Sequence, residues 1–321
     1  MNARQLTDRQ IWLAPMAGFT DLAFREIAKK CGVGVIVSEM VSADGLIFNR
    51  EKSLEYARFT KAQRPFGIQL FGSDPEIMRR AVGVVLKEKP DFIDINMGCP
   101  VNKVVKRGAG SALMRAPDTA IEIVRAVKSE LGDMPLSVKI RSGWDKERIN
   151  AAEFALQIAE AGADIIVVHP RTRSQMYGGS SDWSLIKDIC LKVDVPVVGN
   201  GDITNLDSAR RMIEETNCDS VMIGRGSVGN PWLFGQIRDF LLTSHPKSLN
   251  YYRKIEDVEA HLRLSIEDKG AIRGLKEMRG HLAAYTKGMT GGAAVRRLIN
   301  SSLDSDEILE AIRTLWINCK I

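Results

Sequence analysis

The sequence predicts an α/β protein: a (β/α)8 TIM barrel followed by a smaller all-helical C-terminal domain. Eight short apolar runs rich in β-branched residues recur along the first three quarters of the chain, and segments of helical period lie between most of them. The runs are almost continuously hydrophobic, which is typical of parallel strands buried on both faces. The last quarter shows only helical periodicity. An open doubly wound sheet is the alternative fold for the first part.

The expected strands and helices alternate along most of the first part of the chain. Helix-start residues precede three of the helices, at Thr20, at Ser73-Asp74-Pro75 and at Thr204. The expected strands are Ile11–Pro15, Val35–Met40, Phe66–Phe71, Phe92–Asn96, Leu136–Ile140, Asp164–His169, Pro196–Asn200 and Ser220–Gly224. The expected helices include Asp21–Cys31, Pro75–Lys87, Pro117–Leu131, Ala151–Ala161 and Asp207–Glu215.

The pattern changes after about Thr243. Ser244-His245-Pro246-Lys247-Ser248 is typical of a linker, and Glu256 to Cys319 has no strand-like run. The sequence therefore predicts two domains, a barrel over residues 1–243 and a helical domain over residues 244–321.

Composition narrows the class of protein. The chain has 321 residues, and 45% of them are hydrophobic, which is enough to bury a large core. The formal net charge of +5 permits a polyanionic partner without requiring one. The five cysteines are widely spaced without a CxxC motif, so we expect reduced thiols in a cytoplasmic protein and no zinc site. The four histidines show no ligand spacing either, so no metal is expected. We find no apolar run of signal-peptide or membrane-span length, and nothing that indicates a protein partner.

Polar residues and glycines collect where the expected strands end, which is where barrel enzymes place their active groups. Glycines follow the seventh and eighth strands in Asn200-Gly201-Asp202 and Gly224-Arg225-Gly226. Their backbone N–H groups would let a phosphate approach, and Arg225 would neutralise its charge. Tight turns between strand and helix are the simpler explanation of the same glycines.

The fifth expected strand carries Lys139 after apolar residues, and a buried lysine needs a counter-charge or a ligand. A lysine beside the N1 and C2 carbonyl edge of a reduced flavin would stabilise its negative charge. Gln69 and Asn96 could hydrogen-bond an isoalloxazine or a uracil. His169 could contact a flavin, or be an ordinary histidine at a strand end.

Cys99 follows the fourth strand between Gly98 and Pro100 and opens the segment Val101–Ser111. This segment is glycine-rich and carries the cations Lys103, Lys106 and Arg107, so we expect a mobile loop that contacts phosphates. A cysteine here could be an acid, a nucleophile or inert. The positions of the other four cysteines fit inert thiols.

A basic stretch marks the C-terminal part. Ala271 to Asn300 contains six basic residues and one acid, and Arg279, His281, Tyr285 and Lys287 fall within about two helical turns. Cations with an interleaved aromatic suit an RNA backbone, and a solvated helix face explains them nearly as well.

These segments together resemble the tRNA-dihydrouridine synthases, the bacterial B-type branch most. The similarity covers the barrel and, more loosely, the helical domain, and the Asn-Met-Gly-Cys-Pro segment after its strand is the most specific part. The matching segments are Ala14-Pro15-Met16-Ala17-Gly18, Asp94-Ile95-Asn96-Met97-Gly98-Cys99-Pro100, Lys139-Ile140-Arg141-Ser142-Gly143-Trp144, His169-Pro170-Arg171-Thr172-Arg173, Gly199-Asn200-Gly201-Asp202-Ile203 and Met222-Ile223-Gly224-Arg225-Gly226.

The resemblance implies an FMN-dependent enzyme that reduces uridine to dihydrouridine in tRNA, in the D-loop, with NADPH or NADH as reductant. It implies that Cys99 is the catalytic acid, that Asn96 and Arg171 contact the target uracil, and that the helical domain docks the tRNA. Lys103, Lys106, Arg107, Arg279 and Lys287 are the expected tRNA contacts. The residues implied to bind FMN are Pro15, Met16, Ala17, Gln69, Lys139, His169, Asn200, Gly201, Asp202, Gly224 and Arg225.

Two residues depart from the family pattern. Pro170 stands where the family usually has glycine, and it should alter an extended segment little. Gly280 stands where related proteins commonly have lysine, which removes one cation from the expected tRNA surface. Two other functions remain open on the residues alone: an FMN-dependent barrel reductase of a free small molecule, and a non-catalytic RNA-binding barrel protein.

Overall fold

The computed structural model describes residues 1–8, 10–243 and 250–319. The chain divides into two units. The barrel unit comprises Met1–Pro15 and Val33–Gly224, and the helical unit comprises Met16–Gly32 and Arg225–Ile321. The expected linker, Ser244 to Ser248, lies outside the described residues. Over the described part of the chain, no helix is long and apolar enough to cross a membrane.

Eight parallel strands close into a barrel in the order β2-β1-β10-β9-β8-β6-β5-β4, and β4 pairs back with β2. The predicted TIM barrel is therefore confirmed. The barrel strands are β1 (Ile11–Leu13), β2 (Val35–Val37), β4 (Phe66–Phe71), β5 (Phe92–Met97), β6 (Leu136–Asp145), β8 (Ile165–Thr172), β9 (Val197–Asn200) and β10 (Ser220–Ile223).

Some predicted strand limits were wrong, and two short strands were not predicted. Strand β6 continues past Ile140 because it forms an antiparallel hairpin with β7 (Arg148–Ile149). Strand β8 continues past His169 to Thr172, which pairs with Gly143 beyond a register shift. Strand β3 (Val41–Ser42) pairs with β4. Two-residue strands are too short to give a periodic signal in the sequence.

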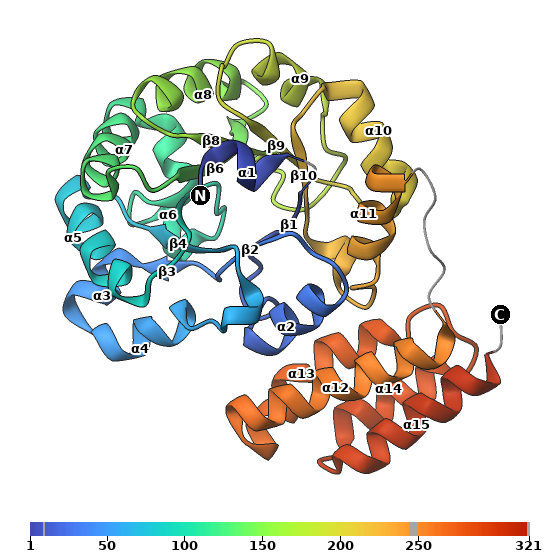
Figure 1. Cartoon of the computed structure of the whole chain (residues 1–321). Helices are drawn as coiled ribbons and strands as arrows, with labels where there is room; N and C mark the ends of the chain where they lie inside the picture. The colour runs from blue at the N-terminus through green and yellow to red at the C-terminus, as the bar shows by residue number, and fades with distance from the viewer. Residues whose placement is uncertain (9, 244–249, 320–321) are drawn as a thin grey trace. The chain divides into compact units, whose positions relative to one another are not determined.

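Helices of the barrel unit surround the strands (Figure 1). Among them α7 has the predicted limits, and Asp74 caps α5 as predicted. The N-cap of α10 is Asn205 and not Thr204, because the Asn205 side chain accepts the Ser208 N–H at 2.8 Å. These helices are α1 (Ala3–Thr7), α3 (Ala43–Phe48), α4 (Arg50–Leu54), α5 (Pro75–Val85), α6 (Asn102–Val105), α7 (Pro117–Leu131), α8 (Ala151–Glu160), α9 (Ser184–Cys190) and α10 (Leu206–Thr216).

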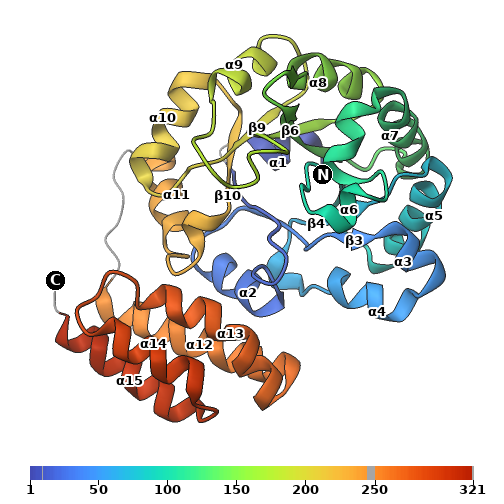
Figure 2. The same cartoon turned by 180° about the vertical axis from the view of Figure 1, so that it is seen from behind.

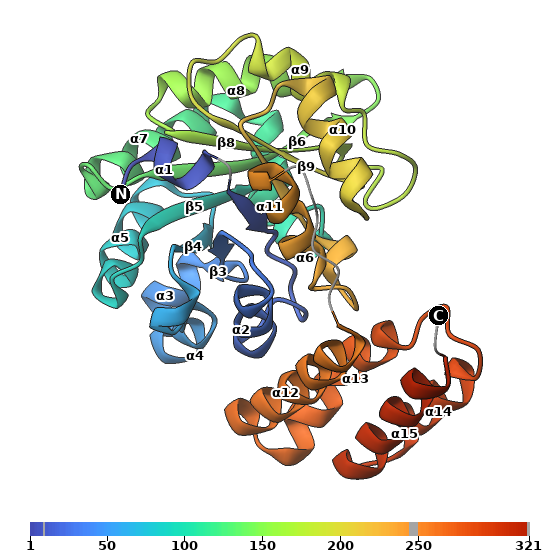
Figure 3. The same ribbon diagram turned by 45° about the vertical axis from the view of Figure 1, so that its right-hand side comes forward.

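Helix α1 closes one end of the barrel. Leu6 and Trp12 are fully buried there with Phe92, and the Trp12 indole N–H donates to the Leu6 carbonyl at 2.9 Å. Figure 1 views the barrel from this end, Figure 2 views it from the opposite end, where α6 lies, and Figure 3 shows it obliquely. The end with α6 carries the carboxyl ends of the strands, so ligands must enter there.

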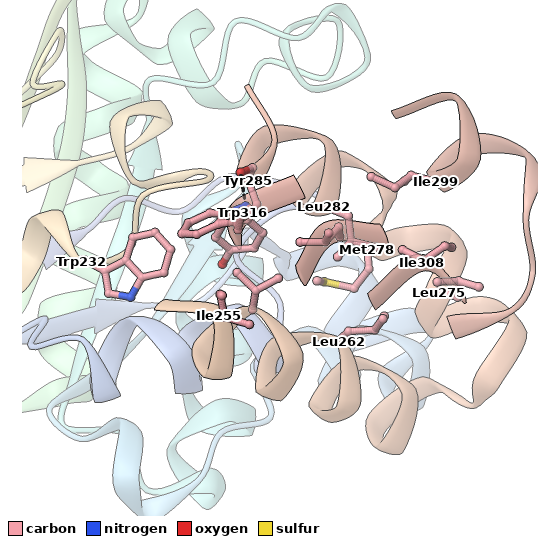
Figure 4. Packing of buried hydrophobic residues seen from close by; sticks show 12 residues of the cluster. Trp232, Ile255, Leu262, Leu275, Met278, Leu282, Tyr285, Ile299, Ile308 and Trp316 are labelled. Carbon is pink, nitrogen blue, oxygen red and sulfur yellow. Dashed lines mark hydrogen bonds between the residues drawn. The ribbon is translucent and has the colours of Figure 1, made fainter. Parts of the chain in front are cut away.

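The helical unit has a core of its own (Figure 4). Trp232 and Trp316 are buried in it, and the Trp316 indole N–H donates to the Tyr285 carbonyl at 3.1 Å. The predicted helical C-terminal region is thus confirmed. The helices of the helical unit are α2 (Leu22–Lys30), α11 (Leu233–Thr243), α12 (Tyr251–Lys269), α13 (Ala271–Tyr285), α14 (Gly292–Ser301) and α15 (Ser305–Asn318).

The segment Met16–Gly32 follows β1 in the sequence but belongs to the helical unit. The Phe24 ring stacks on His281 with centroids 4.6 Å apart, and His281 Nε2 lies 2.9 Å from the Phe19 carbonyl oxygen. Lys269 forms an ion pair with Asp21. Asp21, and not Thr20, caps α2, because the Thr20 hydroxyl is bonded to the backbone of Met16.

Candidate functional site

The carboxyl ends of four barrel strands bring together side chains predicted to bind a cofactor or a substrate. Asn96 on β5 donates from Nδ2 to Gln69 Oε1 on β4 at 2.8 Å. Lys139 on β6 donates to Asn200 Oδ1 on β9 at 2.9 Å, and Asn200 in turn donates to the Met222 carbonyl at 2.7 Å. These four predicted residues therefore form two hydrogen-bonded pairs at the same end of the barrel.

A buried carboxylate that the sequence analysis gave no role anchors the first pair. Asp94 is fully buried and accepts hydrogen bonds from Gln69 Nε2 at 2.6 Å and from the Ser137 hydroxyl. Burial raises the pKa of the Asp94 carboxyl to about 6, against the opposing effects of Ser137, Gln69 and Lys139. The signal that could have identified Asp94 is a charged residue inside an apolar strand, two positions before Asn96 and so on the same face.

The hydrogen bonds continue from Asp94 to the backbone of Cys99. Because Asp94 accepts from the Gln69 amide nitrogen, the Gln69 oxygen faces Asn96. Asn96 then presents its own oxygen to the N–H groups of Gly98 at 3.1 Å and Cys99 at 2.8 Å. The orientation of both amide side chains is therefore set by one buried carboxylate.

Every peptide group next to Cys99 is held on its other side as well. Arg141 donates from Nε to the Gly98 carbonyl at 2.8 Å. Ser111 donates from its N–H at 3.1 Å and its hydroxyl at 2.9 Å to the Cys99 carbonyl. Gly110 has φ +61°, and a Cβ there would lie 2.8 Å from the Cys99 carbonyl oxygen, so only glycine lets the chain pass this closely.

The Cys99 thiol itself is partly buried. Burial raises the pKa of the Cys99 thiol, although the backbone N–H of Val101 and the charge of Arg141 act in the opposite direction. A raised pKa keeps the proton on sulfur at neutral pH. The arrangement therefore suits a proton donor better than a thiolate nucleophile.

Lys139 is partly buried, and burial together with the charge of Arg141 lowers the pKa of its ammonium to about 8, while Asp94 raises it. Among the described residues its Nζ donates one hydrogen bond, to Asn200. An ammonium has three donors, so two remain for a ligand with carbonyl or anionic oxygens.

Three further predicted residues meet between β8 and the segment after β9. The buried Arg171 guanidinium binds both carboxylate oxygens of Asp202, at 2.7 and 2.8 Å, and lies 3.2 Å from His169 Nε2. Asp202 has a left-handed φ of +55° and also accepts the Ser181 N–H at 2.7 Å. In this structure Arg171 and Asp202 fix each other, and Gly201 lies beside His169, where a Cβ would come within 2.9 Å of the ring.

The remaining predicted cofactor residues lie where the chain passes from one unit to the other. Pro15 and Gly224 are partly exposed and end barrel-unit segments, whereas Met16, Ala17 and Arg225 belong to the helical unit. Met16 is held by the Thr20 hydroxyl, which accepts its N–H at 2.9 Å. Pro170 lies inside β8. This segment is extended, which is the conformation that a proline in place of the usual glycine requires.

The predicted phosphate-contacting loop contains regular structure. Lys103 lies on α6, Lys106 and Arg107 follow it, and all three side chains are exposed. The segment ends in a 3-10 helix, η4 (Gly110–Arg115). A four-residue helix has no measurable periodicity, so the sequence does not predict it.

In the helical unit the predicted tRNA contacts differ in exposure. Lys287 is exposed, whereas Arg279 is partly exposed and donates to the Ser302 carbonyl at 3.3 Å. His281 and Tyr285 are both only 2% exposed, so the idea of an aromatic interleaved with surface cations was wrong. Both face the core because they lie four residues apart, on the same side of α13.

The sequence of this chain matches a known protein family over nearly its whole length. The sequence model of the family described as dihydrouridine synthase matches residues 12–318. A probable tRNA-dihydrouridine synthase of Rhodobacter capsulatus is 38% identical over 96% of this chain and 95% of its own. The tRNA-dihydrouridine synthase B of Pasteurella multocida is 36% identical over 96% of this chain and 92% of its own.

The barrel also resembles solved structures at the level of the fold. An old yellow enzyme homologue from Zymomonas mobilis superposes with a TM-score of 0.54 at 16% identity, covering 74% of this chain and 90% of that chain. Because the family match spans nearly the whole chain and the relatives share more than a third of its residues, this chain belongs to the dihydrouridine synthase family.

Proposed function

We propose that this protein reduces uridine to 5,6-dihydrouridine in tRNA, in the D-loop, using FMN with NADPH or NADH as reductant. Family membership supports the reaction, and the names of the relatives support tRNA as substrate. The observation that carries the proposal is Cys99 at the strand ends, whose flanking peptide groups are held by Asn96 and Arg141 and whose thiol has a raised pKa and so keeps its proton.

The residues at the strand ends fit FMN. Among the described residues, Lys139 has two unused donors, which suit the carbonyl edge of an isoalloxazine, and Asn96 has one unused N–H, which suits the target uracil. We propose the full predicted set for the cofactor. FMN, when bound, would supply the hydride for C6 of the uracil.

The protein's own groups would supply the rest of the chemistry. Cys99 would deliver its thiol proton to C5 of the uracil, on the face opposite the hydride. The uridine must leave its stack to reach the barrel mouth, because a base inside a helix cannot contact Cys99. We propose that residues 1–243 carry the reaction and residues 244–321 dock the tRNA.

A direct test combines the purified protein, NADPH and an unmodified tRNA transcript, followed by mass spectrometry of the digested nucleosides. We expect a uridine species heavier by the mass of a hydride and a proton. A second substrate is cellular tRNA that carries its other modifications but no dihydrouridine. If the protein binds flavin and consumes NADPH but reduces neither this tRNA nor the transcript, the result would favour a small-molecule reductase. Protein that binds tRNA without any flavin would favour the non-catalytic RNA binder.

The lowered pKa of the Lys139 ammonium predicts that FMN binding depends on pH. Below about pH 8 the ammonium is charged, and it loses its proton as the pH rises through that value. We therefore expect the FMN affinity of the apoprotein to fall as pH rises through about 8, measured by fluorescence quenching. Lys139→Met should bind FMN more weakly and without this dependence, while the exposed Lys187→Met should behave as wild type. An unchanged profile in Lys139→Met would show that another group is responsible.

A further inference from the structure

A pocket of about 590 Å³ lies in the barrel unit between α6, η4 and β7. Its lining includes three cations, Lys106, Arg115 and Arg148, and no carboxylate. Arg148 is paired with Asp145, which holds both its Nε and Nη2, so its charge is largely compensated. Lys106 and Arg115 are exposed and have no ion-pair partner among the described residues. The pocket, here called the basic pocket, therefore carries uncompensated positive charge.

Arg115 is held in a geometry suited to an anion. Its guanidinium carbon lies 3.9 Å from the centroid of the Trp144 ring, so the cation stacks on the aromatic face. Trp144 also contacts Arg173, whose guanidinium carbon lies 4.9 Å from the centroid of the same ring and whose Nη2 donates to Asn102. A stacked guanidinium keeps its N–H groups free in its own plane, and this planar fork matches two phosphate oxygens.

The basic pocket is connected to Cys99 through the chain. Helix α6 belongs to the segment that Cys99 opens, and Ser111 in η4 donates to the Cys99 carbonyl. Arg115 ends the same short helix. An RNA strand that delivers a base to Cys99 would therefore bring its neighbouring phosphate groups to the residues of this segment.

We propose that the basic pocket binds a backbone phosphate of the tRNA beside the target uridine, with Arg115 as its bidentate ligand and Lys106 as a second cation. This inference rests on the proposed function. A phosphodiester is favoured over a free carboxylate metabolite because two uncompensated cations line the pocket and the exposed Lys103 and Arg107 belong to the same segment of the chain.

The test measures tRNA affinity and its salt dependence for Arg115→Gln and Arg115→Lys, with unmodified tRNA transcript as the probe. Arg115→Gln should weaken binding about tenfold at low salt, since a charge-assisted hydrogen bond is lost. It should also reduce the slope of log affinity against log salt by about one. Arg115→Lys keeps the charge but not the fork, so it should keep the slope and still lose most of the affinity.

Controls come from exposed cations of the same unit. Arg125→Gln on α7 and Lys187→Gln on α9 remove the same charge and should leave affinity unchanged. In turnover, Arg115→Gln should raise KM for tRNA with little change in kcat, and NADPH consumption without tRNA should equal wild type. The proposed phosphate site would be overturned if Arg115→Lys bound tRNA with wild-type affinity, or if Arg125→Gln lost as much tRNA affinity as Arg115→Gln. Either result would indicate that the positive charge of the whole surface attracts the tRNA. A wild-type protein that forms no dihydrouridine would instead refute the proposed function itself.

Discussion

Cys99→Ala should lower the rate of uridine reduction by about 10²- to 10⁴-fold, which is the usual contribution of a positioned general acid. The variant removes the proton donor but leaves the backbone hydrogen bonds of residue 99 to Asn96 and Ser111 intact. Flavin content and flavin reduction by NADPH should therefore equal those of wild type. Rapid mixing of the reduced enzyme with tRNA, with quantification of dihydrouridine, measures the effect.

Cys190→Ala is the matched control for this experiment. Cys190 lies at the end of α9, and burial raises the pKa of its thiol to about 12, so it is an unreactive cysteine in the same unit. We expect wild-type turnover in this variant. Equal turnover of Cys99→Ala and wild type would refute the assignment of the acid.

Asp94→Leu should lose most turnover and also destabilise the fold. The substitution leaves the Gln69 amide and the Ser137 hydroxyl without their buried acceptor, which costs about 1–3 kcal/mol for each orphaned group. Without Asp94, Gln69 can rotate and release Asn96, and the N–H of Cys99 loses its fixed acceptor. Urea unfolding and dihydrouridine formation measure the two effects separately.

Asp94→Asn separates the geometry of this site from its charge. The asparagine oxygen can accept from Gln69 while its nitrogen donates to the Ser137 hydroxyl, so the hydrogen bonds survive and the charge does not. We expect turnover to recover if orientation of Cys99 is the role of Asp94. Asp164→Asn is the control: this carboxylate binds Lys128 and the Leu136 N–H before β8 begins, so the variant should lose stability without losing turnover. Equally poor turnover in Asp94→Asn and Asp94→Leu would assign the effect to the charge beside Lys139.

Much of the barrel could be predicted because its signals are local. Strand β4 and helix α7 have the predicted limits, since each is a self-contained run with its own period and flanking residues. Gln69, Asn96, Lys139 and Asn200 could be placed at one end of the barrel because parallel strands share a direction.

The missed features depend on contacts between distant residues. Nothing local in the sequence shows that Asp94 accepts a hydrogen bond from Gln69, 25 positions earlier, or that the Ser137 hydroxyl donates a second hydrogen bond to Asp94. The burial of Tyr285 was also missed, because charge counting along α13 does not reveal which face packs inward.

The grouping of Met16–Gly32 with the helical unit has a consequence for chimeric proteins. Asp21, Phe24 and the Phe19 carbonyl all find their partners on α12 and α13. A hybrid protein joined near residue 244 would take α12 and α13 from one relative and the segment 16–32 from another, so their contacts would not match. The natural exchangeable module is therefore discontinuous, and a functional swap between relatives should carry residues 16–32 together with the C-terminal helices.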